Sequence, residues 1–326
     1  MPSTPTHSRR RALAWGATAL AAPGLALAQL GDKPLRIILP LSAGSGADGA
    51  IRAISNSLAK ALGQPVVIEN LPGAGGITGT TQLVRAPKDG SVIGVVSNNH
   101  VVNPSVYKNI PFDSIEDITP ITIIGATPFV LVAHPAVPAR NVKELIALAK
   151  AKPGVLNYGS SGNGTILHLG AAMFVEQAQV DIKHIPYKGM GPLMNDILGG
   201  QVQLGVVAVA PAAAHIKAGT LRALGVSTAA RVPSLPDVPT IAEQGLPRYE
   251  LDGWIAAVAP AGIPKAEVAR LHAGFRHALA MPEARDALIA QGYEIKLSAP
   301  EASTAFMRSE LARMAQVVKN AHVTMD

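Results

Sequence analysis

Three strand-like segments of this sequence run directly into loops of glycine and hydroxyl residues, and each loop is followed by a helical pattern. The strand-like segments are residues 35–40, 66–69 and 156–158, and the loops are residues 42–46, 73–76 and 159–165. Such a junction leaves backbone N–H groups at a helix start without partners inside the helix. These groups can hold an anion without help from a cationic side chain. The pattern therefore predicts strand–loop–helix units that bind a small anion.

Strand-like and helical segments alternate from residue 35 to about residue 227, which favours an α/β fold with largely parallel sheets. A proline-rich connection, residues 231–247, is followed by a strand at 251–259 and by helices at 264–280 and around residues 307–318. We expect these last helices to pack on the first unit, so that the middle unit is an insertion joined by two crossings. The predicted domains are residues 29–128 with 254–326, and residues 129–253.

The first 28 residues have the pattern of a signal peptide. Arg9, Arg10 and Arg11 precede an apolar stretch, Ala12–Leu25, that is too short and too rich in alanine for a good membrane span. We expect cleavage after Ala28 and a mature protein in the periplasm. No cysteine occurs in the chain, so disulfides, thiolate metal sites, cysteine nucleophiles and a lipid attached to cysteine are excluded.

Charge and hydropathy narrow the possible partners. The formal net charge is +6, and three of the positive charges lie in the leader. The remaining charge is only mildly basic, and no Lys/Arg cluster with interleaved aromatic residues occurs, so we expect no nucleic-acid binding. No later segment is long and uncharged enough to insert into a bilayer. Any action at a membrane would therefore go through a partner protein.

The first junction also matches a dinucleotide-binding fingerprint. Gly44–Gly49 fits G-x-G-x-x-G, and Glu69 ends the next strand, where an acid would bind a ribose. An exported oxidoreductase with bound NAD(P) is therefore an alternative. Four residues, Pro40–Ala43, separate the strand from the first glycine, which makes the turn longer than a pyrophosphate needs. A flexible strand-to-helix loop is the plainer explanation.

The third junction is the most specific of the three. It carries four polar side chains within six residues, from Ser160 to Thr165, and Thr165 is placed to cap the helix that follows. Capping needs one such residue, so the surplus favours a ligand site. His168 lies one helical turn further and is either a packing residue or a ligand contact. Lys188 follows another strand and is the best single counter-charge for an anion.

Motifs for catalysis and metal binding are absent from the sequence. It has no phosphate-binding G-x-x-x-x-G-K-[ST] loop, no H-x-x-x-H or H-E-x-x-H spacing and no G-x-S-x-G nucleophile motif. We therefore expect neither an enzyme nor a cofactor.

A series of short motifs in a fixed order resembles the Bug family, the periplasmic substrate-binding proteins of tripartite tricarboxylate transporters. The resemblance covers residues 35–315 and is carried by Pro40–Gly44 with Asp48, Asn70–Gly76, Pro87–Gly90, Asn157–Gly164, Tyr187–Pro192, Gly200–Val202, His215–Gly219, Leu235–Thr240 and Ala259–Pro264. It implies a two-lobed periplasmic-binding-protein fold, type II-like, with a hinge made of two crossings. It also implies a monomer that closes on a small organic carboxylate and delivers it to membrane permease subunits. A sensor subunit that uses the same fold is an alternative.

The resemblance also implies which residues contact the ligand. The implied contacts are Ser42, Ala43, Gly44, Asp48, Gly75 and Asn98 from the first lobe, and Ser160, Ser161, Gly164, Thr165, His168 and Ala208 from the second. Two departures from the family pattern matter. Gly205–Val209 lacks the acid that many relatives carry there, so we expect a ligand without an amine. Gly46 and Ala47 replace a common Pro-Thr pair, which removes one hydroxyl contact.

Overall fold

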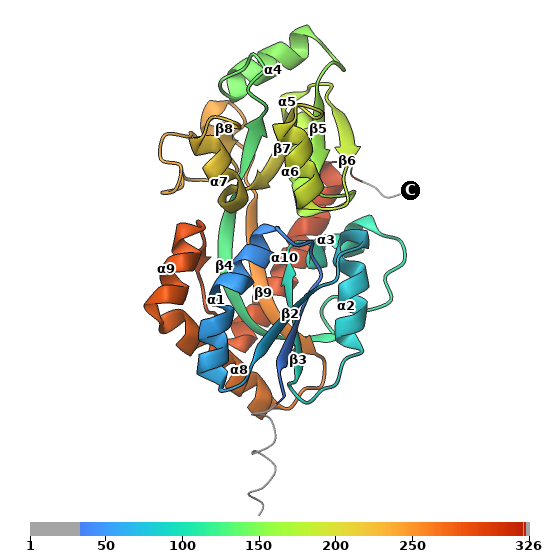
Figure 1. Cartoon of the computed structure of the whole chain (residues 1–326). Helices are drawn as coiled ribbons and strands as arrows, with labels where there is room; N and C mark the ends of the chain where they lie inside the picture. Colours follow the sequence, from blue (N-terminus) through green and yellow to red (C-terminus); the bar gives the residue numbers. More distant parts are fainter. Residues whose placement is uncertain (1–32, 322, 324–326) are drawn as a thin grey trace, which may run out of the picture.

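The structure is a computed structural model that describes residues 33–321 and 323, so the predicted signal peptide lies outside the described residues. The chain forms two α/β lobes, one above the other in Figure 1, and one long strand runs through both. This strand, β4 (Ile118–Ala133), pairs with β9 (Asp252–Pro260) in the lower lobe and with β7 (Leu204–Ala208) and β8 (Arg222–Val226) in the upper lobe. The predicted two-lobed binding-protein fold is confirmed.

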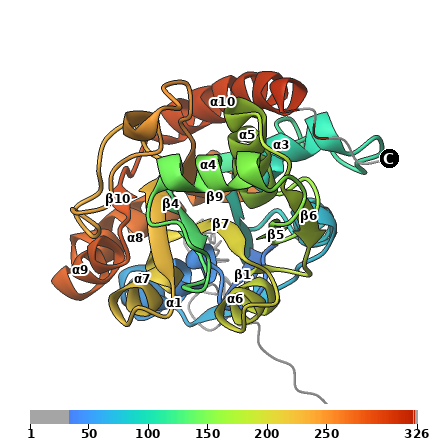
Figure 2. The same cartoon turned by 90° about the horizontal axis from the view of Figure 1, so that it is seen from above.

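The first lobe contains the N-terminal segments and the C-terminal helices. Its remaining elements are β1 (Leu35–Leu39), α1 (Gly46–Leu62), β2 (Val66–Asn70), η1 (Ala74–Gly76), α2 (Ile77–Val84), β3 (Val92–Ser97), α3 (Asn99–Val106), α8 (Lys265–Ala280), α9 (Pro282–Ala290), β10 (Glu294–Ile295) and α10 (Pro300–Asn320). Helices α8 and α10, the two that the sequence predicted there, pack on α1 and α3 of the first lobe, and α10 also reaches the second lobe at α5 (Figures 1 and 2). Helix α9, which the sequence did not predict, packs on α1 as well.

The second lobe lies between β4 and β9 in the sequence. Its remaining elements are α4 (Val142–Ala151), β5 (Asn157–Ser160), α5 (Ile166–Ala178), β6 (Lys183–Pro186), α6 (Met190–Leu198), α7 (Val209–Lys217) and η2 (Ala242–Gln244). None of the helices in the described part of the chain is both long enough and apolar enough to span a membrane.

The sheet corrects the expectation of largely parallel strands. Its strand order is β2-β1-β3-β9-β4-β7-β5-β6, and the strands next to β4 and β9 are antiparallel to them, so the sheet is mixed. Residues 118–133 form one continuous strand. Both features have one cause. The chain passes between the lobes once in each direction, and the outgoing and returning strands pair with each other.

The returning crossing, β9, is fastened to the first lobe by one buried side chain, Asn98. Thr127 on β4 is paired with Gly253 on β9, at the level where the chain passes between the lobes. Asn98 donates from Nδ2 to the carbonyl oxygen of Asp252 at 3.0 Å, and its Oδ1 accepts from the N–H of Trp254 at 2.8 Å. The predicted domain boundaries, at residues 128/129 and 253/254, fall next to this fastening and stay a prediction.

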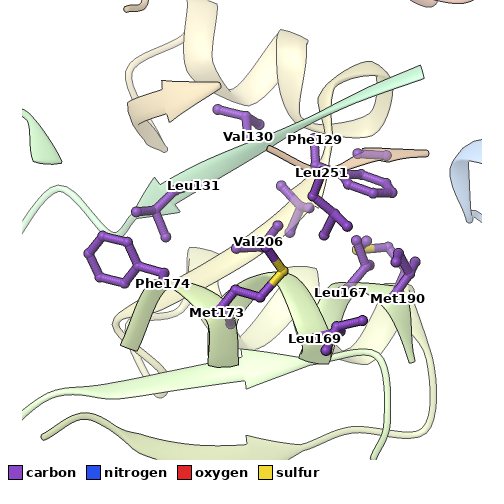
Figure 3. Packing of buried hydrophobic residues seen from close by; sticks show 14 of the residues in the cluster. Phe129, Val130, Leu131, Leu167, Leu169, Met173, Phe174, Met190, Val206 and Leu251 are labelled. Atoms are coloured by element: carbon purple, nitrogen blue, oxygen red, sulfur yellow. The ribbon is translucent and has the colours of Figure 1, made fainter. Parts of the chain in front are cut away.

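The core of the second lobe surrounds α5. This helix is apolar on nearly all sides, which is typical of a buried helix. In Figure 3 its side chains Leu169, Met173 and Phe174 face Val206 of β7 and Leu131 of β4. Such packing fixes the position of the helix start, which is the third junction.

Helix α10 is anchored to β9 by a buried carboxylate. Glu310, which is 6% exposed, accepts from the indole Nε1 of Trp254 at 2.9 Å and from the Nε and Nη2 atoms of Arg313 at 2.6 and 3.0 Å. On the same helix, Arg308 pairs with Glu116 at 2.7 Å, but both side chains are more than half exposed. The two ion pairs on α10 therefore allow the stability contribution of a buried carboxylate to be compared with that of an exposed one.

We expect Glu310→Ala to lower the free energy of unfolding by about 1–3 kcal/mol, because it leaves the buried indole N–H without a partner. Glu116→Ala should cost less than about 1 kcal/mol, because its partner returns to water. Urea unfolding followed by circular dichroism measures both variants. Equal costs for the two would contradict the anchoring role of Glu310.

Candidate functional site

A cavity of about 540 Å³ lies between the two lobes. Six of the predicted site residues line it, namely Ser42, Gly75 and Asn98 from the first lobe and Ser161, Thr165 and Ala208 from the second. The other six are not in its lining: Ala43, Gly44, Asp48, Ser160, Gly164 and His168. The structure thus brings half of the predicted residues together and gives several others a supporting position behind the lining.

At the start of α1, the carboxylate of Asp48 fixes the conformation of the preceding loop. Asp48 is buried, and its carboxylate accepts from the N–H of Gly44 at 3.0 Å, from Nε of Arg52 at 2.9 Å and from Nδ2 of Asn70 at 3.0 Å. Ser45 caps the helix by accepting from the N–H of Asp48. Asp48 therefore holds the loop instead of facing the cavity.

This arrangement leaves two amides of α1 available. Gly46 and Ala47 line the cavity, and their N–H groups have no hydrogen-bond partner among the described residues. The positive end of the helix dipole is centred on these groups. The first lobe therefore presents two backbone donors to the cavity.

At the start of α5, the hydroxyl groups bond to one another. Ser161 Oγ donates to Thr165 Oγ1 at 3.1 Å, and Thr165 Oγ1 donates to the carbonyl oxygen of Gly162 at 2.8 Å while it caps the N–H of His168. The N–H groups of Ser161, Asn163 and Leu167 line the cavity without a partner in residues 33–321 and 323. The third junction therefore offers peptide N–H groups, and its hydroxyls set the loop conformation.

Two stacked histidines lie behind this loop. The rings of His168 and His184 are 3.9 Å apart between centroids and nearly parallel. His168 Nδ1 accepts from the N–H of Gly164 at 3.1 Å, and His184 Nε2 is 2.7 Å from Ser160 Oγ. Burial lowers the pKa of His168 to about 3, helped by His184, and burial lowers the pKa of His184 to about 4. Both rings are neutral at pH 7 and hold the loop from behind.

Three hydrogen bonds join the lobes around the cavity. The carboxamide Oδ1 of Asn99 accepts from the N–H of Ile166 at 2.8 Å, which partners the first amide of α5. Tyr107 Oη donates to the carbonyl oxygen of Asn163 at 3.2 Å, and Ser42 Oγ accepts from the N–H of Met190 at 3.4 Å. The lobes are therefore in direct contact at two places, between α3 and the start of α5 and between the loop before α1 and the start of α6.

The charge of the lining fits an anion. No aspartate or glutamate lines the cavity in the described part of the chain, and Lys188, which is exposed, is the one formally charged residue in the lining. No group of three or more potential metal ligands occurs among the described residues. Glu69, which stands at the ribose position of the dinucleotide fingerprint, is bonded through both oxygens to Arg36 at 3.0 and 2.8 Å.

Several lining residues were missed from the sequence. Asn99 and Tyr107 belong to α3, a helix that the sequence did not predict because Pro104 lies within it. Tyr293 follows α9, which was also missed, and reaches the cavity from the far end of the chain. Asparagine doublets and turns after strands are common, so no local signal singles these residues out.

The fold and the cavity define a two-lobed solute-binding protein of the periplasmic type. Residues 50–323 match the family model described as "Tripartite tricarboxylate transporter family receptor". The chain belongs to this receptor family, and the resemblance noted in the sequence is confirmed.

Relatives support the assignment. "Protein BugT" of Bordetella pertussis (strain Tohama I) is 32% identical over 289 residues, which are 88% of this chain and 89% of BugT. The solved structure of periplasmic binding protein BugD is 34% identical, with a TM-score of 0.86 over 90% of this chain and 99% of BugD. A structure described as "R. palustris Rpa4515 with adipate" is 30% identical, with a TM-score of 0.86 over 90% of this chain and 98% of Rpa4515.

The histidine pair predicts a pH dependence of stability. An unfolded histidine titrates near pH 6.5, whereas these two titrate near 3 and 4 in the fold. Between about pH 6.5 and 4 the unfolded chain binds protons that the folded protein does not, so stability falls as the pH is lowered through this window. We expect the thermal unfolding midpoint to decrease from pH 7 to pH 4.

His184→Phe keeps an aromatic ring in the stack and removes one titrating group, so its unfolding midpoint should decrease less steeply over the same range. His277→Gln changes an exposed histidine of α8 and should keep the wild-type slope. Differential scanning fluorimetry at several pH values compares the slopes. A wild-type slope for His184→Phe would show that the stacked pair is not the source.

Proposed function

We propose that this protein captures a small organic carboxylate between its lobes and delivers it to a tripartite membrane permease. The observation that carries the proposal is a set of peptide N–H groups that lie at one cavity from both lobes, without a partner or a lining carboxylate among the described residues. A carboxylate supplies acceptors for such donors and is favoured by the positive ends of the helix dipoles.

The number of donors agrees with a useful affinity. A hydrogen bond to a charged acceptor contributes about 1.5–3 kcal/mol net. Micromolar binding corresponds to about 8 kcal/mol. The amides of Gly46 and Ala47 with those of Ser161, Asn163 and Leu167 reach this value after ordering costs are subtracted. Neither lobe reaches it alone, so ligand binding favours the closed arrangement.

The ligand class follows from what the lining contains. The related Rpa4515 structure is described with adipate, a carboxylate without an amine. Here β7 ends at Ala208, which lines the cavity, and no carboxylate in the described residues lines the cavity to pair with an ammonium group. The ligand is therefore a carboxylate that is not an amino acid.

The wider role rests on the family. The match to the receptor family supports a role beyond the inner membrane. We propose that the protein acts there as a monomer, after cleavage of its leader behind Ala28, and needs permease subunits to move the ligand onward. The two closing bodies of the proposal are the predicted domains. Isothermal titration calorimetry with mono-, di- and tricarboxylates, amino acids and sugars tests the binding step. Binding of sugars or amino acids, with no carboxylate bound, would refute the proposal.

Lys188 provides the first mutational test. We expect Lys188→Ala to weaken carboxylate binding about two- to five-fold, because an exposed charge contributes up to about 1 kcal/mol. The difference should shrink as salt is raised from about 0.01 M to 1 M, because screening shortens the reach of the charge. Titration calorimetry at both ionic strengths measures it.

Lys183→Ala is the matched control, since Lys183 is exposed on the neighbouring β6 and does not line the cavity. It removes the same charge from the lobe and should leave the affinity within about two-fold of wild type. Equal losses in both variants would mean that net charge, and not a contact at the rim of the cavity, is responsible.

A further inference from the structure

One buried hydroxyl in the cavity has no role in the site as described so far. Tyr293, between α9 and β10, is 4% exposed, lines the cavity and makes no side-chain hydrogen bond with any described residue. Another buried tyrosine, Tyr249, is 1% exposed and donates from Oη to the carbonyl oxygen of Gly170 at 2.9 Å. The ring of Tyr293 is buried, but its Oη atom is not among the enclosed unpartnered atoms of the described residues, so it is open to the cavity. The Tyr293 hydroxyl is therefore placed to bond to whatever occupies the cavity.

The hydroxyl lies where the two lobes meet at the start of α1. A Cβ atom built on Gly46 would be 3.5 Å from Tyr293 Oη and 3.2 Å from Cβ of Ala208 on the opposite lobe. Gly46 and Ala47 have the unpartnered N–H groups of α1. The phenol of Tyr293 and the peptide N–H groups of Gly46 and Ala47 therefore lie close together, beside Ala208.

This place differs from the start of α5. The α5 loop meets Asn99 and Tyr107 of α3, whereas Gly46 meets Ala208, which precedes α7. Seen from above, α1 lies beneath α7 on one side, and α3 lies beside α5 on another (Figure 2). The cavity therefore has two separate groups of donors. Much of the remaining lining is apolar, including Leu41, Phe129 and Met190.

The phenol acts as a donor in this setting. Burial raises the pKa of Tyr293 above its ordinary value, so the hydroxyl keeps its proton at neutral pH. No cation of the described residues contacts it, and the neighbouring peptide groups of α1 are donors as well. An oxygen acceptor completes this group of donors, whereas a methyl group leaves the phenol unpartnered.

We propose that Tyr293 is a specificity-determining ligand contact, which donates to an oxygen at the end of the ligand remote from the carboxylate held at α5. The inference rests on the proposed function and deepens it, because it selects carboxylates with a second oxygen-bearing end and an apolar middle. A dicarboxylate then binds more tightly than the monocarboxylate of the same chain length.

The test compares wild type and Tyr293→Phe by titration calorimetry with succinate, glutarate, adipate and pimelate, and with the matched butyrate, valerate, hexanoate and heptanoate. Wild type should prefer at least one dicarboxylate to its monocarboxylate. Tyr293→Phe should weaken binding of that dicarboxylate by roughly ten-fold or more, which is typical of one hydrogen bond to a charged acceptor, and leave the monocarboxylate unchanged.

Two further variants separate contact from structure. Tyr249→Phe removes a buried hydroxyl that bonds within the second lobe outside the cavity, so it should lower the unfolding midpoint without changing the ratio of the two affinities. Gly46→Ala would press on Ala208 of the opposite lobe as well as on the Tyr293 hydroxyl, so it should weaken both members of a pair and serves as the comparison for a non-selective loss.

The outcomes are distinguishable. If wild type binds carboxylates and Tyr293→Phe leaves the ratio unchanged, or weakens both members of a pair equally, the inference is overturned and the proposed function stands. If wild type binds neither these eight acids nor any other carboxylate in the wider panel, the proposed function fails and the inference fails with it.

Discussion

The structure depends on how the loops before α1 and α5 use their polar side chains. Asp48 and Thr165 bond to backbone and side-chain groups of their own loops, and this fixes the loops without occupying the cavity. Because these side chains support the backbone, the peptide N–H groups at the helix starts are left for a ligand. A site built in this way needs little formal charge in its lining. The single cation at the rim, Lys188, is consistent with that.

The contacts between lobes show why closure and binding are linked. Asn99 already partners the first amide of α5, so part of the lobe interface forms from protein groups alone. The amides of Gly46 and Leu167 lie on opposite lobes and lack such a partner in the described residues. A ligand that bonds to both adds free energy to the closed form only, which is the differential interaction that a population shift requires. Asn98 bonds to β9 on either side of Gly253 and so ties the returning strand to the first lobe.

Much of the fold was predictable from local patterns, and the site was predictable only in part. Helix α1 and the strands around it follow from apolar spacing and capping, and the family follows from the order of the motifs. The antiparallel crossing of β4 and β9 was not predictable, because an apolar run does not reveal its partner strand. Asp48 and His168 were predicted as ligand contacts, but they lie behind the cavity lining and bond to the loops. A polar residue near a helix start is equally suited to hold the loop, and sequence does not distinguish the two roles. Tyr293 is far from the α1 loop in the sequence, so only tertiary structure brings them together.

The division of the cavity into backbone donors at α5 and side chains at the remote end explains how one fold accepts different organic acids. Backbone donors at α5 recognise a carboxylate, and since peptide groups are identical in every relative, substitution does not readily change this contact. The remote end of the cavity is formed instead by side chains and small residues, here Gly46, Ala208 and Tyr293. Ala208 offers no partner for an amine, and the glycine at position 46 leaves room beside the phenol. Affinity for a carboxylate therefore depends on the α5 end of the cleft, and selectivity among carboxylates depends on the remote end. Substitutions at the remote end can change the selectivity while the affinity for the carboxylate group is kept.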